Sequence, residues 1–203
     1  MAEPAELCRL QWFNDLYRRI YDVLSIEGML PGPCNIHILP VGALEAVEKI
    51  IVAAAMKGAN TVWFKVQPPS PITFAHELIH LVEGKDGELE EAYAYNLSPL
   101  VVLLAERNIV PPVNPLRLFN VTPGMVLDAI NQAYNHRFKD LIEYFKLKGV
   151  IPHFVKEDHT IREGYSERDI VVDVVSELAT AAERDERALK ALLLLLEWLR
   201  GSR

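Results

Sequence analysis

"FAHELIHLVEGKDGELEEAYAYN", residues 74–96, sets two histidines and several glutamates into an otherwise apolar part of the chain. Two apolar segments on either side of the short turn GKDG predict a helical hairpin. His76 and His80 are four residues apart, so their rings lie on one face of the first helix, one turn apart. This spacing lets two imidazole nitrogens reach one tetrahedral Zn²⁺ at about 2.0–2.1 Å. The stretch therefore predicts a zinc site on a helix.

Glu77 directly follows the first of these histidines. Its carboxylate points to the side of the histidine pair, where it can take a proton from a metal-bound water and pass it to a leaving group. This is the HExxH arrangement of zinc metallopeptidases. The remaining sides of the helix are apolar, so burying this polar stripe without a metal or partners would be costly. The competing interpretation is a pair of core histidines with satisfied hydrogen bonds beside a surface glutamate.

Two histidines leave Zn²⁺ one protein ligand short of a catalytic site. If the helices turn around GKDG, residues equidistant from the midpoint of the turn stand level across the hairpin. His80 then faces Glu91, and His76 faces Tyr95. Glu91 is therefore the predicted third ligand among the five acidic residues within reach, which are Glu83, Asp86, Glu88, Glu90 and Glu91.

The chain before the hairpin predicts two helices and two strands. Apolar residues at three- and four-residue spacing predict a helix over residues 5–27, and alternation predicts a short strand over 35–39. Residues 41–58 are predicted to be helical, with glycine in the usual C-terminal stop position. The β-branched and aromatic segment 61–66 predicts a second strand.

From residue 70 onwards the sequence predicts helices almost throughout. Ser70 is a plausible N-cap for a helix that runs to about residue 83, and Pro99 either kinks or splits the helix that follows GKDG. Residues 110–115 resemble a linker. Three further helices are expected, over residues 122–148, 167–183 and 184–200. A polar loop is expected over residues 152–165.

The hairpin also supports a resemblance to a known family. HELIH, followed on the next helix by EEAYAY with Glu91, Ala94 and Tyr95 forming E-x-x-A-Y, resembles the gluzincin clan of zinc metallopeptidases. In that clan a glutamate on a separate helix is the third zinc ligand. The resemblance covers about residues 35–105 and implies an α+β fold with a minimal zincin core. That core comprises a small sheet with a backing helix, an active-site helix and a glutamate helix.

The chain is expected to divide into a zincin-like core with an N-terminal helix, residues 1–110, and a helical C-terminal region, residues 111–203. The resemblance implies that the strand 61–66 forms the upper edge of the cleft, where an extended peptide could add as a further strand. The alternative for this strand is that Trp63 and Phe64 pack into the core on alternate faces.

A second possible third ligand is Asp86. The interval from His80 to Glu91 is shorter than is usual in gluzincins. Asp86 stands where a metzincin-like HExxHxxGxxD pattern places its aspartate, although that pattern requires glycine where this chain has Glu83. Both ligands remain possible at this point.

The predicted function is zinc-dependent hydrolysis of peptide bonds in a peptide or protein substrate. The two motif histidines and Glu91 would hold the ion, and Glu77 would serve as general base and then as proton donor to the amine. Tyr95, or its neighbour Tyr93, could donate a hydrogen bond to the oxyanion. The alternatives are a non-catalytic regulatory or binding protein with a zincin fold, and a structural helical protein without metal.

Composition narrows the function classes. The 203 residues carry a net charge of −7 with scattered positive charges, which argues against nucleic-acid binding. No apolar run approaches the roughly 18 residues of a membrane span, and no secretory signal is recognisable, so a cytoplasmic location without membrane contact is expected. Cys8 and Cys34 lack the CxxC spacing of a metal or redox site and are expected to be reduced thiols.

Overall fold

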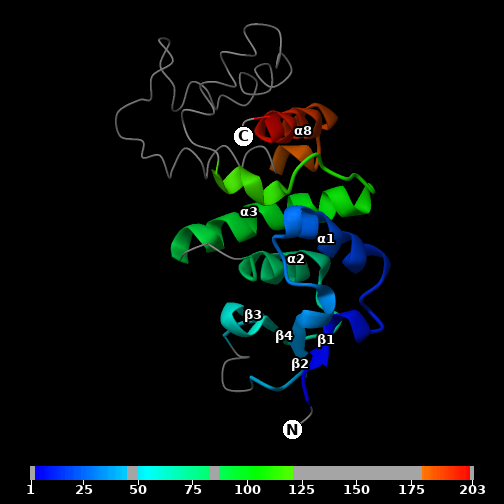
Figure 1. Ribbon diagram of the computed structural model, residues 1–203, viewed down its shortest axis with the longest axis vertical. Coiled ribbons are helices and arrows are strands. Elements are labelled where there is room, and N and C mark those ends of the chain that lie inside the picture. Colours follow the sequence, from blue (N-terminus) through cyan, green and yellow to red (C-terminus); the bar gives the residue numbers. More distant parts are fainter. Residues whose placement is uncertain (1–2, 45–49, 83–86, 121–179, 202–203) are drawn as a thin grey trace, which may run out of the picture. The chain divides into compact units, whose positions relative to one another are not determined.

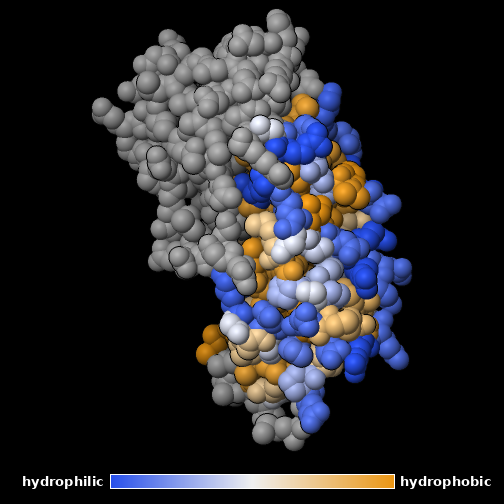
Figure 2. All heavy atoms as spheres, viewed as in Figure 1, coloured by the Kyte–Doolittle hydropathy of each residue, from blue (hydrophilic) through white to orange (hydrophobic). Residues whose placement is uncertain are grey.

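The computed structural model describes residues 3–44, 50–82, 87–120 and 180–201. The chain divides into two compact units, residues 1–110 and 111–203. The first unit combines a small mixed sheet with helices, so the fold is α+β. On the face drawn in Figure 2, hydrophilic and hydrophobic residues are intermixed over the described surface.

Four short strands form the sheet, in the order β1-β2-β4-β3. β2 and β4 run parallel, whereas β1 is antiparallel to β2 and β3 is antiparallel to β4. β4 is therefore an interior strand, and β1 and β3 lie at the edges. The strands span Ala5–Glu6 (β1), His37–Leu39 (β2), Ala53–Met56 (β3) and Thr61–Phe64 (β4).

The interior position of β4 corrects one expectation. β4 was predicted to form the upper edge of a cleft, but it pairs with strands on both sides. Trp63 and Phe64 are fully buried, and because successive strand residues face opposite sides of a sheet, they pack on alternate faces. Among the described strands, β3 is the one that lies at this edge of the sheet and offers unpaired backbone groups.

The helix predicted over residues 41–58 is also wrong in the residues described. Residues 41–44 form a turn, β3 occupies Ala53–Met56, and Lys57–Ala59 form a short 3-10 helix. The helix preference of the alanines is weak against tertiary pairing, and the antiparallel ladder with β4 pairs the backbone groups on one side of the segment. Asn60, at φ 47°, closes the connection between the two strands. Residues 45–49 of the predicted backing helix lie outside the described residues.

The N-terminal helix begins later than predicted. α1 spans Asp15–Ser25, while the residues before it form β1 and the 3-10 helix η1, Leu7–Arg9. Pairing of β1 with β2 removes this segment from the helix that its apolar spacing suggests. The main-chain amide of Leu7 donates to the carbonyl of Ile36 at 2.8 Å and extends that pairing.

Cys8 and Cys34 form a disulfide, with their Cα atoms 4.9 Å apart. The expectation of two reduced thiols is therefore wrong. The two cysteines are 26 residues apart in sequence, and it is the pairing of β1 with β2 that brings their segments together. Sequence spacing alone does not reveal this approach.

The helical hairpin is present as predicted. α2 spans Pro71–His80 and α3 spans Gly87–Glu106, with Pro99 inside one continuous helix. α2 lies between the sheet and α3, as Figure 1 shows, and packs against α1, α3 and β3. The loop between the two helices, residues 83–86, lies outside the described residues.

An aromatic cluster fixes α2 to the rest of the unit. The Phe74 ring lies 5.7 Å from the Trp12 ring, 5.3 Å from the Tyr17 ring and 6.2 Å from the Phe64 ring, measured between centroids. Most of these pairs are edge-to-face, the geometry that the charge distribution of aromatic rings favours. The first turn of α2 is thereby locked to the sheet and to the segment that opens α1.

The described part of the second unit is helical. It contains the 3-10 helix η5, Pro115–Asn120, and α8, Glu186–Gly201. α8 matches the helix predicted over 184–200. The predicted helix 122–148, the loop 152–165 and nearly all of the helix 167–183 lie outside the described residues. Within the described residues, no helix combines the length and the apolar character that crossing a membrane requires.

Candidate metal centre

α2 holds the histidines in a defined place because both of its ends are specified. The Ser70 hydroxyl accepts a hydrogen bond from the main-chain amide of Thr73 at 3.1 Å, and Pro71 occupies the first turn. The helix ends at His80 with a tighter final turn, in which the amide of Leu81 donates to the carbonyl of Leu78. One face of the helix is apolar and buried, and it consists of Phe74, Ala75, Leu78 and Ile79.

The two motif histidines and the predicted third ligand lie together. The Nε2 atoms of His76 and His80 are 3.1 Å apart. One carboxylate oxygen of Glu91 lies 3.3 Å from the Nε2 atom of His76, and the other lies 3.0 Å from the Nε2 atom of His80. The hairpin therefore brings together the three side chains that were predicted to hold the metal ion.

The three donor groups fit a tetrahedral zinc ion. Bonds of about 2.0–2.1 Å in tetrahedral geometry separate two ligand atoms by about 3.3 Å. The three closest pairs of donor atoms lie between 3.0 and 3.3 Å apart. Two imidazole nitrogens and one carboxylate are also a ligand set found at catalytic zinc sites. Both the chemistry and the spacing of the donors thus suit the ion.

The electrostatics of His76 favour the form that binds metals. Burial lowers the pKa of His76, and the neighbouring His80 lowers it further. Glu91 and the main-chain carbonyl of Ala94, which accepts a hydrogen bond from the ring, partly oppose this shift. A neutral imidazole is the metal-binding form, and a hydrogen bond from its ring to a backbone carbonyl fixes its orientation.

Glu77 is the buried ionisable group beside the three donors. Its side chain is 6% exposed, and burial raises its pKa from the ordinary 4.5 to about 7, with His80 opposing and Glu91 adding to the shift. A carboxyl group that titrates near neutral pH can both accept and release a proton under ordinary conditions. Glu77 therefore has the properties that the predicted general base needs.

Tyr95 borders the same site. Its ring lies 4.8 Å from the His76 ring, at an interplanar angle of 69°, and the side chain is 66% exposed. It is therefore an exposed residue and not part of the core. The side chain of Tyr93, the other candidate, is not among the described ones.

The other candidate ligands are not among the described side chains. Asp86 and Glu83 lie outside the described residues, as do the side chains of Glu88 and Glu90. Of the remaining histidines, His37 lies in β2, away from the hairpin, and the others lie outside the described residues; these are His136, His153 and His159.

A cavity of about 430 Å³ lies at the same end of α2 as His80. Its lining includes Val82, Asn60 and the segment 27–31. Glu27 and Asn60 adopt positive φ angles of 65° and 47°, a region that residues other than glycine seldom occupy. Both residues lie at turns of the chain, Glu27 in the short 3-10 helix after α1 and Asn60 between β3 and β4.

Reasoning from the sequence missed two features of the site. The first is the carbonyl of Ala94, which orients His76 and carries no sequence signal because every residue has a carbonyl. The second is β3, which lies against α2 and forms the sheet edge. The β-branched run Ile50–Val52 before β3 was the available signal for a strand there.

We compared the chain with protein-family models, with curated proteins and with solved structures, and none of the three comparisons finds a match.

Proposed function

We propose that this chain is a zinc-dependent peptidase of the gluzincin type, with a zincin-like core in residues 1–110. The observation that carries the proposal is the close approach of the donor atoms: the Nε2 atoms of His76 and His80 lie 3.1 Å apart, and each lies 3.0–3.3 Å from a different carboxylate oxygen of Glu91. Glu77, on the same helix as the two histidines, carries a buried carboxyl group. Together these groups supply a metal site and an adjacent base, which is the minimum set for metal-assisted hydrolysis.

The chain's own residues would handle the protons. A bound zinc ion would supply Lewis acidity, which polarises the scissile carbonyl and makes water acidic. Glu77 would take the proton from the attacking water and give it to the departing amine, since its raised pKa suits both transfers. Tyr95, exposed beside His76, could donate a hydrogen bond to the developing oxyanion.

β3 is the strand that could receive the substrate. Along the edge it presents backbone groups that no described strand pairs with, and α2 packs against it. Val52, next to β3, is 66% exposed and Met56 is 38% exposed. An extended peptide could add to this edge by main-chain hydrogen bonds, with apolar contacts to these side chains.

The test is hydrolysis of a mixed peptide library by the zinc-loaded full chain, compared with Glu77→Gln. We expect the wild type to cleave and the variant to lose about 10²–10⁴-fold in kcat while it keeps its zinc. Glutamine retains the size of the side chain but cannot accept the proton. Glu106→Gln, at the far end of α3, is the matched control and should leave the rate unchanged.

Two outcomes would count against the proposal. Equal rates in wild type and Glu77→Gln would show that the cleavage comes from elsewhere. Zinc binding without cleavage of any peptide would favour the alternative of a non-catalytic binding protein built on the same core. In that case zinc would serve to hold the hairpin together.

A further inference from the structure

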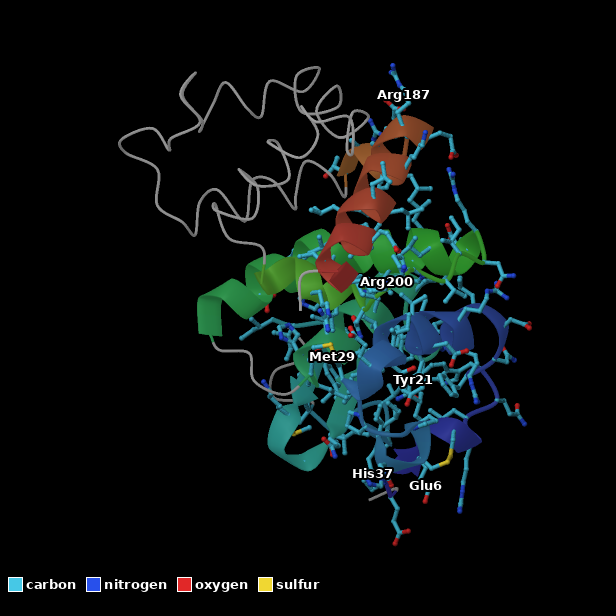
Figure 3. The ribbon with its side chains drawn as sticks, turned by 45° about the horizontal axis from the view of Figure 1, so that its top comes forward. Glu6, Tyr21, Met29, His37, Arg187 and Arg200 are labelled. Atoms are coloured by element: carbon cyan, nitrogen blue, oxygen red, sulfur yellow. A yellow bond between two sulfur atoms is a disulfide. The ribbon has the colours of Figure 1, made fainter. Side chains whose placement is uncertain are left out.

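A second group of metal-ligating side chains lies in the N-terminal part of the first unit. It consists of Glu6, Cys8 and Cys34, whose ligand atoms all lie within 4.8 Å of one another. The Cys8 Sγ atom is 3.8 Å from Oε2 of Glu6. Figure 3 shows the yellow sulfur bond beside Glu6, at the same end of the unit as His37.

Backbone hydrogen bonds hold these residues together in addition to the disulfide. β1 pairs with β2, which places Glu6 opposite His37. The amide of Leu7 also donates to the carbonyl of Ile36 at 2.8 Å. Because these main-chain hydrogen bonds are separate from the sulfur bond, we expect the two thiols to stay close to each other and to the carboxylate when that bond is broken.

The group is open to reagents from solvent. Cys34 is exposed and Cys8 is half-buried. Nε of Arg9 lies 2.8 Å from Oε2 of Glu6, and the Arg9 side chain is 77% exposed. This ion pair is weak because solvent screens it, so an incoming cation can displace Arg9 from the carboxylate. Reduction would therefore leave two accessible thiols beside the Glu6 carboxylate.

We propose that reduction of the Cys8–Cys34 disulfide converts this group into a binding site for a thiophilic divalent cation such as zinc. The protein ligands are the two thiolates and Glu6, and water completes the tetrahedron. Zinc–sulfur bonds of about 2.3 Å set the two sulfurs about 3.8 Å apart, which rotation of the exposed Cys34 side chain can supply. Two soft sulfur ligands select zinc over magnesium or calcium.

The redox step balances with a dithiol reductant. The reductant transfers two electrons and two protons to the disulfide, so the sulfur–sulfur bond breaks, two thiols form and the reductant becomes a disulfide. Binding of the cation then releases the thiol protons to solvent. A disulfide oxidant reverses the sequence and expels the cation. The metal content of the chain thus depends on the redox state around it.

The test is a Co²⁺ titration of the full chain, followed through the near-ultraviolet charge-transfer absorption that only thiolate ligands give. Wild type reduced with a phosphine, which does not compete as a thiol ligand, should develop this absorption, and its final intensity should correspond to one thiolate-bound Co²⁺ per chain. Oxidised wild type and the double variant Cys8→Ser/Cys34→Ser should not. Glu6→Gln should bind Co²⁺ at least about tenfold more weakly.

The signal is independent of the proposed peptidase site. His80→Gln should show the same thiolate absorption as wild type, so failure of one proposal does not imply failure of the other. A second measurement needs no variant: zinc should protect the reduced wild-type thiols from alkylation. Absence of the absorption in reduced wild type, or its persistence in the double cysteine variant, would overturn the proposal and leave the disulfide as a structural link only. Unchanged affinity in Glu6→Gln would overturn the three-ligand site.

Discussion

The two ligand groups of the first unit are held in different ways. His76, His80 and Glu91 are carried by two consecutive helices within 16 positions of sequence, and their donors are nitrogen and oxygen. Glu6, Cys8 and Cys34 come from two segments that meet through strand pairing, and two of their donors are sulfur. The first group is set by local helical geometry, and the second by long-range register. We therefore expect the helix-held group to respond to helix stability and pH, and the strand-held group to respond to redox state.

The largest expected effect concerns the strand-held group. Replacing both cysteines, Cys8→Ser/Cys34→Ser, removes a link that closes a loop of 26 residues. A loop of this length lowers the entropy of the unfolded chain enough to stabilise the fold by about 3 kcal/mol. Denaturant unfolding of the oxidised proteins should show a loss of this size. Zinc content of the helix-held group should not change; a parallel loss of zinc there would show that the two groups are coupled.

A pH-dependent effect should appear only beside the helix-held group. The pKa of Glu77 in the folded protein is about 7, above its ordinary 4.5, so the folded state holds a proton that the unfolded state has lost. The stability due to this group is complete below pH 4.5 and is lost as the pH rises through 7. In the metal-free protein, Glu77→Gln should therefore become more stable than wild type as pH rises, by up to about 3 kcal/mol. Thermal unfolding between pH 4 and 8 measures this difference. If the stabilities of wild type and Glu77→Gln changed with pH in parallel, the assigned pKa would be contradicted.

The smallest expected effect concerns the start of α2. Ser70→Ala removes the cap that accepts from the amide of Thr73 and should cost about 1 kcal/mol of stability. Ser25→Ala is the matched control, since its hydroxyl only donates to the carbonyl of Asp22 at 3.0 Å. Zinc affinity of the helix-held group should fall in Ser70→Ala alone. An equal fall of Co²⁺ affinity at the reduced cysteines would break the distinction between the two groups.

The helix-held group could be predicted from the sequence because its geometry is local. A four-residue spacing fixes the relation of His76 to His80, and a short turn fixes which residues of the next helix stand level with them. Ser70 and Pro71 mark the start of α2 by their own chemistry. None of these inferences requires knowledge of how distant segments pair.

The predictions that were wrong concern segments whose structure depends on contacts with distant parts of the sequence. Residues 53–56 favour a helix by composition, but pairing with β4 makes them a strand. The disulfide depends on β1 lying beside β2, and the segment 5–9 resembles the start of α1 in its apolar spacing. Strand register is set by contacts far apart in sequence, so local patterns do not determine it.

The most direct test of the helix-held metal centre is zinc content per chain in oxidised protein, where the cysteines cannot bind metal. Wild type, Glu91→Gln and the control Glu106→Gln, at the far end of α3, would be purified without affinity metal and analysed for zinc. We predict about one zinc per chain in wild type and Glu106→Gln and a large loss in Glu91→Gln. Zinc retained in Glu91→Gln would assign the third ligand elsewhere, with Asp86 the next candidate. Wild type that holds no zinc even after incubation with it would contradict the metal centre itself.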